Sequence, residues 1–247
     1  MQAIALIRLL LLCMPLPIWY GCATATEASQ KEANLSATGT VTTTLSPKYT
    51  SHPNITATLF WIGEAANADN NHITNIESAW DDSWLQHYGG LDTPRRTTLF
   101  PTNFIPKENP FYCALPYNDF DDNGLRRADA TQRIPWASEK RWDENESIVK
   151  NRWVAITDQN RTLYAQWEDA GPFVYDDADY VFGTRYPRNR RNRQAGLDLS
   201  PACWIYLGYD TRTMDNEIKV TWHFVDAKEV PEGPWKKIVT TRQISWK

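Results

Sequence analysis

The sequence has few of the residues and motifs that build metal centres, phosphate-binding loops or nucleic-acid surfaces. Its four histidines do not have the spacing of metal ligands. It contains no Gly-rich phosphate loop and no nucleophile elbow. Acidic residues outnumber basic ones, 30 to 26, which disfavours a nucleic-acid partner. We therefore expect no metal, no cofactor and no nucleic acid.

Long apolar runs are missing after Gly21, so no transmembrane segment is expected beyond that point. Leu9–Gly21 itself is an apolar run of the length found in secretory leaders, and Ala23–Ala25 supplies small residues for cleavage. Residues 1–25 are therefore predicted to be a signal peptide of a secreted, periplasmic or cell-envelope protein. The competing interpretation is a lipid anchor at Cys22, which Gly21 fits and the bulky Trp19-Tyr20 does not.

Cysteine is scarce as well. Cys13 and Cys22 belong to the leader, which leaves Cys113 and Cys203 in the exported chain. Two cysteines in an oxidising compartment most simply form one disulfide, so a Cys113–Cys203 bridge is predicted. The alternative is a pair of buried free thiols.

The remaining chain has the strand spacing of a β-protein. Residues 26–55 are rich in Thr, Ser, Ala and Asn and are predicted to be a flexible tether. Residues 56–247 are long enough for one well-buried domain. A short helix is expected within Ser78–Tyr88. The strands expected from β-branched and aromatic runs are Ala57–Ile62, Phe111–Leu115, Arg152–Thr157, Thr162–Trp167, Glu217–Asp226 and Lys237–Trp246.

The most informative stretch is Gly196–Gly208. Ser200 is a good N-cap, Pro201 suits the first helical position, and Gly208 is placed to end the helix. Just before it, alternation turns the flanking Leu197 and Leu199 inward and Asp198 to the opposite face of a short strand. Asp198 is then placed either for chemistry or as a second cap of the helix.

Gly196–Gly208, with its Gly-Leu-Asp-Leu-Ser-Pro-Ala sequence, resembles the signature of double-psi β-barrels such as bacterial expansins and the rare-lipoprotein-A type of lytic transglycosylase. Gln166–Phe173 is similar to the Asp-Arg-Gly-Pro-Phe block of the second group, and Val220–Asp226 is similar to the last barrel strand of expansins. The resemblance implies an all-β, six-stranded double-psi barrel in a single domain, with a few short helices.

The resemblance also implies that the Asp of each block, Asp169 and Asp198, lines one glycan groove. A pair of carboxylates is what general acid–base attack on a glycosidic bond requires, although Asp169 can instead be structural at its Gly-Pro turn. Two departures weigh against activity. Tyr112 stands where the transglycosylase group has a His, and Ala170 replaces the Arg of its block.

Several other side chains are candidates for substrate binding. Trp61, Trp84 and Trp167 are candidates for stacking on sugars. Glu64 is either an additional acid or a solvated loop residue. The set of binding candidates is Trp61, Glu64, Tyr117, Asp119 and Trp167.

Two charged segments have open interpretations. Asp119–Gly124 matches the first half of a Ca²⁺ loop, but Ala130 stands where the bidentate acid belongs, which favours a polar turn. Five arginines between Phe182 and Gly196 form either a solvated flexible loop or a basic rim that attracts an anionic glycan. They are Arg185, Arg188, Arg190, Arg191 and Arg193.

Two functions of different classes follow. One is a cell-wall glycan-cleaving enzyme of the lytic transglycosylase or hydrolase type. The other is a non-catalytic, expansin-like protein that binds a polysaccharide and loosens packed chains through the same groove. In both, the partner is a cell-wall glycan or another polysaccharide.

Overall fold

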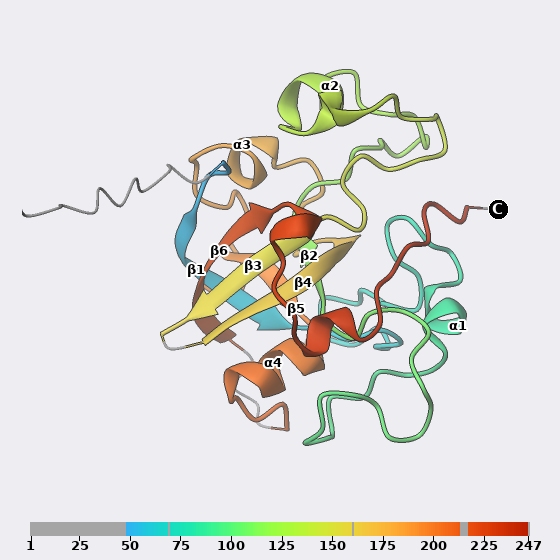
Figure 1. Cartoon of the computed structure of the whole chain (residues 1–247), viewed down its shortest axis with the longest axis vertical. Helices are drawn as coiled ribbons and strands as arrows, with labels where there is room; N and C mark the ends of the chain where they lie inside the picture. The colour runs from blue at the N-terminus through green and yellow to red at the C-terminus, as the bar shows by residue number, and fades with distance from the viewer. Residues whose placement is uncertain (1–47, 69, 160, 213–216, 247) are drawn as a thin grey trace, which may run out of the picture. The chain divides into compact units, whose positions relative to one another are not determined.

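The chain forms a closed β-barrel (Figure 1). A computed structural model describes residues 48–68, 70–159, 161–212 and 217–246. The barrel strands are β1 (His52–Leu59), β2 (Tyr112–Leu115), β3 (Trp153–Asp158), β4 (Arg161–Ala170), β5 (Ala195–Leu199) and β6 (Glu217–Val225). The short helices are α1 (Trp84–Tyr88), α2 (Ala130–Arg133), α3 (Ala178–Val181) and α4 (Pro201–Leu207), with 3₁₀ turns at Ala137–Glu139, Ala227–Glu229 and Pro234–Lys236. The predicted mainly-β class with a six-stranded barrel and a few short helices is confirmed.

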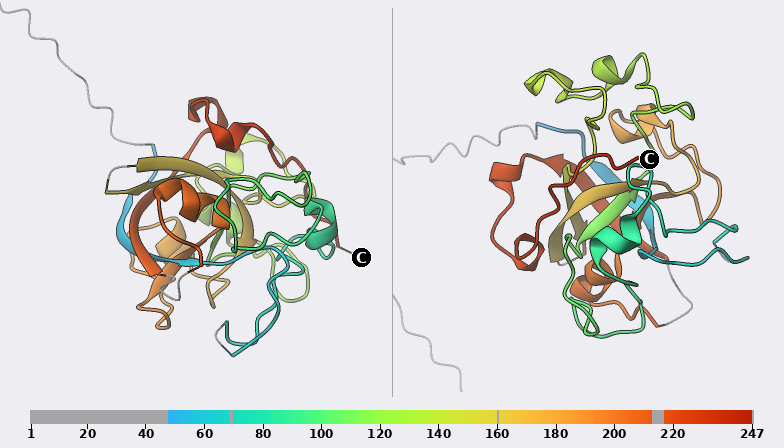
Figure 2. Two further views of the ribbon diagram at one scale, coloured as in Figure 1. Left: turned by 90° about the horizontal axis from the view of Figure 1, so that it is seen from below. Right: turned by 90° about the vertical axis from the view of Figure 1, so that its right-hand side faces the viewer.

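The strand order around the barrel is β1-β5-β2-β4-β3-β6. The pairs β1–β5 and β2–β4 are parallel, and the other four neighbouring pairs are antiparallel. Two long connections join strands that are not neighbours in the barrel. Residues 60–111 join β1 to β2, residues 171–194 join β4 to β5, and the first forms the large blue-green loops beside the strands in Figure 2. Together they surround the candidate site.

The barrel interior is filled by alternating apolar side chains. In β6, Ile218, Val220, Trp222 and Phe224 are all buried, as the alternation predicts. β3 and β4, which correspond to the expected strands Arg152–Thr157 and Thr162–Trp167, form an antiparallel hairpin. The close packing of these buried side chains fixes the positions of the strands that carry the site.

Helix α4 begins and ends where the sequence predicts. The Ser200 side chain accepts a hydrogen bond from the Cys203 backbone N–H, Pro201 occupies the first turn, and Gly208 ends the helix at φ 95°. The Ser200 hydroxyl also donates to the Pro110 carbonyl at 2.7 Å, which ties the start of the helix to the segment before β2. In Figures 1 and 2, α4 lies across one end of the barrel.

Three predictions change in the structure. The helix expected within Ser78–Tyr88 is shortened to α1. Lys237–Trp246 forms no strand in its described part and contributes only a bridge between Ser245 and Asp81. β1 begins at His52, within the predicted tether of residues 26–55, because its first residue is already paired with Trp222 of β6.

The predicted signal peptide, the cleavage site and Cys22 lie outside the described residues. So does the predicted tether before residue 48. Within the described ranges, no helix has the length and apolar character needed to cross a membrane.

The predicted disulfide is wrong, because Cys113 and Cys203 are both free and buried. Cys113 packs in the barrel core, where its register partners are Leu199 and Trp167. The Cys203 sulfur instead lies 3.2 Å from the Ser200 hydroxyl and donates to the Tyr112 carbonyl oxygen at 3.8 Å. Each thiol therefore has surroundings of its own in place of a bond to the other.

Alkylation tests this arrangement. In protein denatured without reductant, we expect iodoacetamide to label both Cys113 and Cys203, as peptide mass spectrometry will show. In the folded protein both should resist labelling, because burial raises the pKa of the Cys113 thiol well above its usual range and that of Cys203 to about 12. A disulfide-linked peptide containing both cysteines would contradict the structure.

Candidate functional site

Asp198 lies on the outer face of β5. Its neighbours Leu197 and Leu199 are fully buried in the barrel core, while Asp198 is partly exposed, as the predicted alternation requires. Thr58, its register partner on β1, donates its hydroxyl hydrogen to Asp198 Oδ1. Asp198 is therefore held by a neighbouring strand and is not a second cap of α4, whose cap is Ser200.

An irregularity in β4 brings Asp169 into line with Asp198. Along β2, Cys113 faces Trp167 but Ala114 faces Asp169, so β4 carries Glu168 as an extra residue at this point. On the other edge of β2, Ala114 faces Asp198. Asp169 and Asp198 are thus the two register partners of one small residue.

This row of side chains lies on three adjacent strands, β5, β2 and β4. Strands two places apart are separated by about 9.5 Å, so the two backbones are about that far apart. Gly171 lies close to the Asp198 carboxyl group. A Cβ there would be 3.3 Å from Asp198 Oδ2, and its φ of 158° also favours glycine.

The two carboxyl groups line one cavity of about 920 Å³ at the barrel surface. Of the predicted binding residues, the structure brings Glu64 and Trp61 into the same cavity. The cavity floor comes from the strands, and its walls come from the loops that follow β1 and β4. Its wall residues include Trp61, Glu64, Ser78, Arg95, Phe173, Tyr175 and Arg193.

Burial raises the pKa of each of these carboxyl groups. Asp198 reaches a pKa of about 8, because burial is joined by the nearby negative charges of Asp169 and Glu64. Burial also raises the pKa of Asp169, to about 7. The backbone N–H groups of Ala79 and Ala170, each 2.8 Å from its Oδ1, oppose this rise because they favour the charged form.

Glu64 is a third carboxyl group with a raised pKa, about 7, again because of burial. The Asn75 side-chain amide donates to Glu64 Oε2 at 2.9 Å and fixes its orientation. Of the two interpretations offered by the sequence, the structure excludes the solvated one, since Glu64 is 7% exposed. Clustered carboxyl groups with raised pKa values are typical of acid–base sites.

The sequence matches no family model and no curated protein.

The prediction that Trp84 and Trp167 stack on sugars is wrong. Trp167 is fully buried and stacks on Phe224 inside the barrel, at 5.7 Å between ring centroids. Trp84 is also buried, in a smaller cluster with Phe60 and Tyr112. Both rings are needed for packing and cannot reach a sugar.

Tyr117 and Asp119 do not belong to the cavity either. Tyr117 is 1% exposed and packs on Phe182. Asp119 is fully buried and accepts hydrogen bonds from the Ser147 hydroxyl and the Ile148 backbone N–H, each at 2.7 Å. It also pairs with Arg126 at 2.9 Å. Asp119 is therefore a structural anchor of the loop that follows β2.

The Asp119–Gly124 segment is the polar turn that the sequence favours. Its carboxylates are used internally: Asp121 Oδ1 accepts from the backbone N–H groups of Asn123 and Leu125. Within the described part of the chain, no group of three or more His, Cys, Asp or Glu side chains is placed to hold a metal ion.

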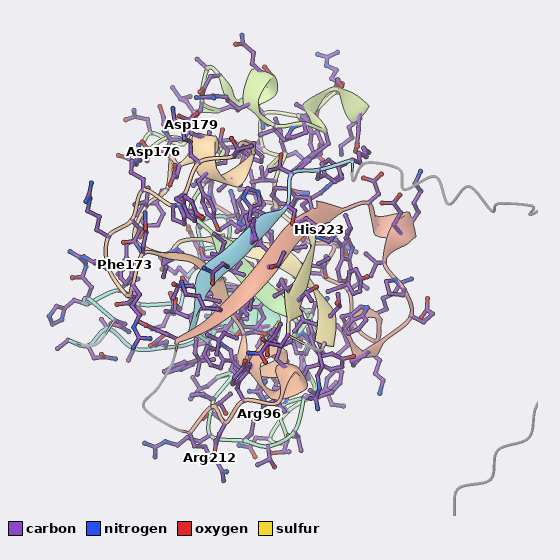
Figure 3. The ribbon with its side chains drawn as sticks, turned by 90° about the vertical axis from the view of Figure 1, so that its left-hand side faces the viewer. Arg96, Phe173, Asp176, Asp179, Arg212 and His223 are labelled. Atoms are coloured by element: carbon purple, nitrogen blue, oxygen red, sulfur yellow. The ribbon has the colours of Figure 1, made fainter. Side chains whose placement is uncertain are left out.

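Sequence reasoning missed the aromatic wall made by Phe173 and Tyr175. Both rings line the cavity, and Tyr175 is 45% exposed. Phe173 has a φ of 60°, which is rare for a bulky side chain and marks a constrained position at the cavity mouth. Figure 3 places Phe173 on the loops at the outer edge of the molecule. The available signal was a pair of aromatic residues shortly after the Gly-Pro turn that follows Asp169.

Proposed function

We propose that this protein binds a glycan strand in the cavity and cleaves a glycosidic bond by general acid catalysis. The observation that carries this proposal is the row Asp198–Ala114–Asp169 across three strands, open to a cavity of about 920 Å³. Two carboxyl groups that face one space and have different pKa values can act as acid and base on the same bond.

The contacts of each carboxyl group assign the roles. Asp198, whose pKa is raised to about 8 by burial and by the nearby charges of Asp169 and Glu64, donates its proton to the glycosidic oxygen as the bond from that oxygen to the anomeric carbon breaks. Asp169, whose charged form is favoured by the backbone N–H groups of Ala79 and Ala170, accepts the proton of the attacking hydroxyl group. That hydroxyl belongs either to water, which gives a hydrolase, or to the sugar itself, which gives an anhydro-sugar product.

The walls of the cavity suit a sugar chain. Trp61 and Tyr175 offer ring faces on which the C–H face of a sugar can pack. Glu64 and Asn75 offer polar atoms to sugar hydroxyl groups. Aromatic platforms beside a few fixed polar groups are typical of small-ligand sites.

The sequence motifs support the same proposal. The Leu-Asp-Leu-Ser and Gly-Pro-Phe blocks resemble those of rare-lipoprotein-A-type transglycosylases and expansins, and here they supply Asp198 and the residues after Asp169. With the predicted leader, this resemblance favours an exported protein that acts on a cell-wall glycan.

One observation favours the non-catalytic alternative of a binding and loosening protein. Asp169 is only 8% exposed, and its Oδ1 already accepts two backbone hydrogen bonds. A carboxylate held in this way stabilises the barrel whether or not it also contacts a ligand. The products formed by the purified protein distinguish the two functions.

We expect the purified protein to release soluble fragments from peptidoglycan sacculi, detected by mass spectrometry. Anhydro-sugar ends would indicate attack by the sugar's own hydroxyl, and reducing ends would indicate attack by water. Binding to sacculi without any product would contradict cleavage and favour the loosening function. Absence of both binding and products, on sacculi and on neutral polysaccharides, would contradict the proposal as a whole.

A further inference from the structure

A second hollow continues from the cavity past its aromatic wall. It has a volume of about 580 Å³ and shares Ile73, Phe173 and Tyr175 with the cavity. It is bounded by the loop around Asn71 on one side and by residues 188–191 on the other. A chain that is bound at the two aspartates can therefore extend along this hollow, which we call the basic groove.

The charge of the basic groove differs from that of the cavity. Asp169, Asp198 and Glu64 line the cavity, whereas none of the described residues lining the basic groove is acidic. Its charged side chains are Arg188, Arg190 and Arg191. The whole chain has a net charge of −4, so this concentration of positive charge is a local feature of the basic groove.

Two of these arginines form no ion pair with a carboxylate of the described residues. Arg188 pairs with Asp176. Arg190 and Arg191 lie beyond ion-pair distance of every carboxylate in the part of the chain that the structure describes. The Arg191 guanidinium lies 5.3 Å from the centre of the Phe173 ring, and so stays beside the aromatic wall.

The arginine segment is held in place, which favours a binding surface over the flexible loop expected by default. Asn189 is 4% exposed, and its side-chain amide donates to the carbonyl oxygens of Arg191 and Ala195 at 3.1 and 2.8 Å. The Gln194 side chain donates to the Pro187 carbonyl at 2.6 Å. Residues 192–194 are all left-handed, with φ of 48°, 50° and 61°, which is a costly conformation for three residues that are not glycine.

We infer that the basic groove is a subsite for a carboxylate-bearing sugar, so that the glycan bound at Asp198 is an acidic one. The Arg190 and Arg191 guanidinium groups can each donate two parallel hydrogen bonds to a carboxylate. Phe173 and Tyr175 supply the stacking surface beside it. A neutral chain would leave both guanidinium groups without an anion. This inference rests on the proposed function, because it names the substrate class of the same site.

The test compares acidic and neutral oligosaccharides by isothermal titration calorimetry. The protein carries Asp198→Asn so that ligands are not consumed. The two acidic probes are an oligogalacturonate, whose carboxylate is on the ring, and a muramic-acid oligomer, whose carboxylate is on a lactyl arm. Their neutral counterparts are the methyl esters.

We expect at least one acidic probe to bind on the order of tenfold to a hundredfold more tightly than its ester, and high salt to reduce the difference. Adding Arg190→Gln and Arg191→Gln together should remove this preference. Arg212→Gln should keep it, because Arg212 is exposed, pairs with Asp210, does not line the basic groove, and lies away from Phe173 in Figure 3. The acidic probe that binds more tightly than its ester shows whether the preferred sugar carries its carboxylate on the ring or on a lactyl arm.

Each other outcome overturns a different statement. Equal binding of acids and esters, or a preference that survives the double arginine substitution, would overturn the basic subsite and leave the glycan cavity intact. Failure of every oligosaccharide to bind would overturn the proposed function and the subsite together. Unchanged melting temperatures of the arginine variants will show that they are folded.

Discussion

Asp198→Asn is expected to reduce the release of glycan fragments by about 10²–10⁴-fold, the contribution typical of a general acid. The amide cannot donate the proton that the departing oxygen needs. It is the same size as the carboxyl group and can still accept the Thr58 hydroxyl hydrogen, so the strand pairing around it is retained. The measurement is the initial rate of soluble product formation per folded molecule at pH 7, with binding to the glycan measured in parallel.

The matched control is Asp158→Asn. Asp158 also accepts a side-chain hydroxyl hydrogen, from Tyr209 at 2.6 Å, but it lies at the end of the β3–β4 hairpin and does not line the cavity. We expect this variant to keep the wild-type rate. If Asp198→Asn and Asp158→Asn have equal rates, Asp198 is not the acid and the assignment fails.

Local rules were sufficient for the stretch that carries Asp198. The order Leu197–Asp198–Leu199 needs only strand alternation to turn the leucines inward, and Ser200 with Gly208 needs only capping to define α4. Such patterns depend on a few consecutive residues, so they can be predicted from a single sequence. The parallel neighbours of β5 cannot be deduced in this way, since they lie far away along the chain.

The position of Asp169 depends on tertiary structure. The extra residue at Glu168 moves Asp169 into line with Ala114, and nothing in the composition of β4 announces that irregularity. A pattern of apolar and polar residues also cannot tell which aromatic rings are buried. Trp61 and Trp167 have similar surroundings in the sequence, yet only Trp61 reaches the cavity.

Two other errors have the same origin. Counting cysteines suggested a bridge, but the direction in which each sulfur points is set by its own strand or helix. Asp119 is a binding candidate in the sequence, whereas its contacts with Arg126 and Ser147 hold it in the interior. In each case contacts from distant parts of the chain outweighed a local preference.

The raised pKa of Asp198 also links the site to stability. In the unfolded chain an Asp ionises near its ordinary pKa of 3.8, and in the folded protein at about 8. As the pH rises above about 4, the unfolded state releases this proton first, so unfolding becomes more favourable. The stability due to this group is complete below the unfolded pKa and is lost by the time the pH has passed 8. His52 acts in the opposite direction, since its pKa is lowered to about 4 by burial and its contribution is lost as the pH falls.

We therefore expect Asp198→Asn to become more stable than wild type as the pH rises. An amide does not ionise, so the variant avoids the loss that the buried carboxyl group causes. The difference in melting temperature, variant minus wild type, should be near zero at pH 4, increase between pH 5 and 8, and level off above pH 9. His52 is present in both proteins, so its effect cancels in this difference. A difference that stays constant with pH would mean that folding does not shift the pKa of Asp198, and a difference that falls would mean that folding stabilises its charged form. Either result would remove Asp198 as the proton donor. A rise in stability together with loss of activity would mark a residue kept for its chemistry at the expense of the fold.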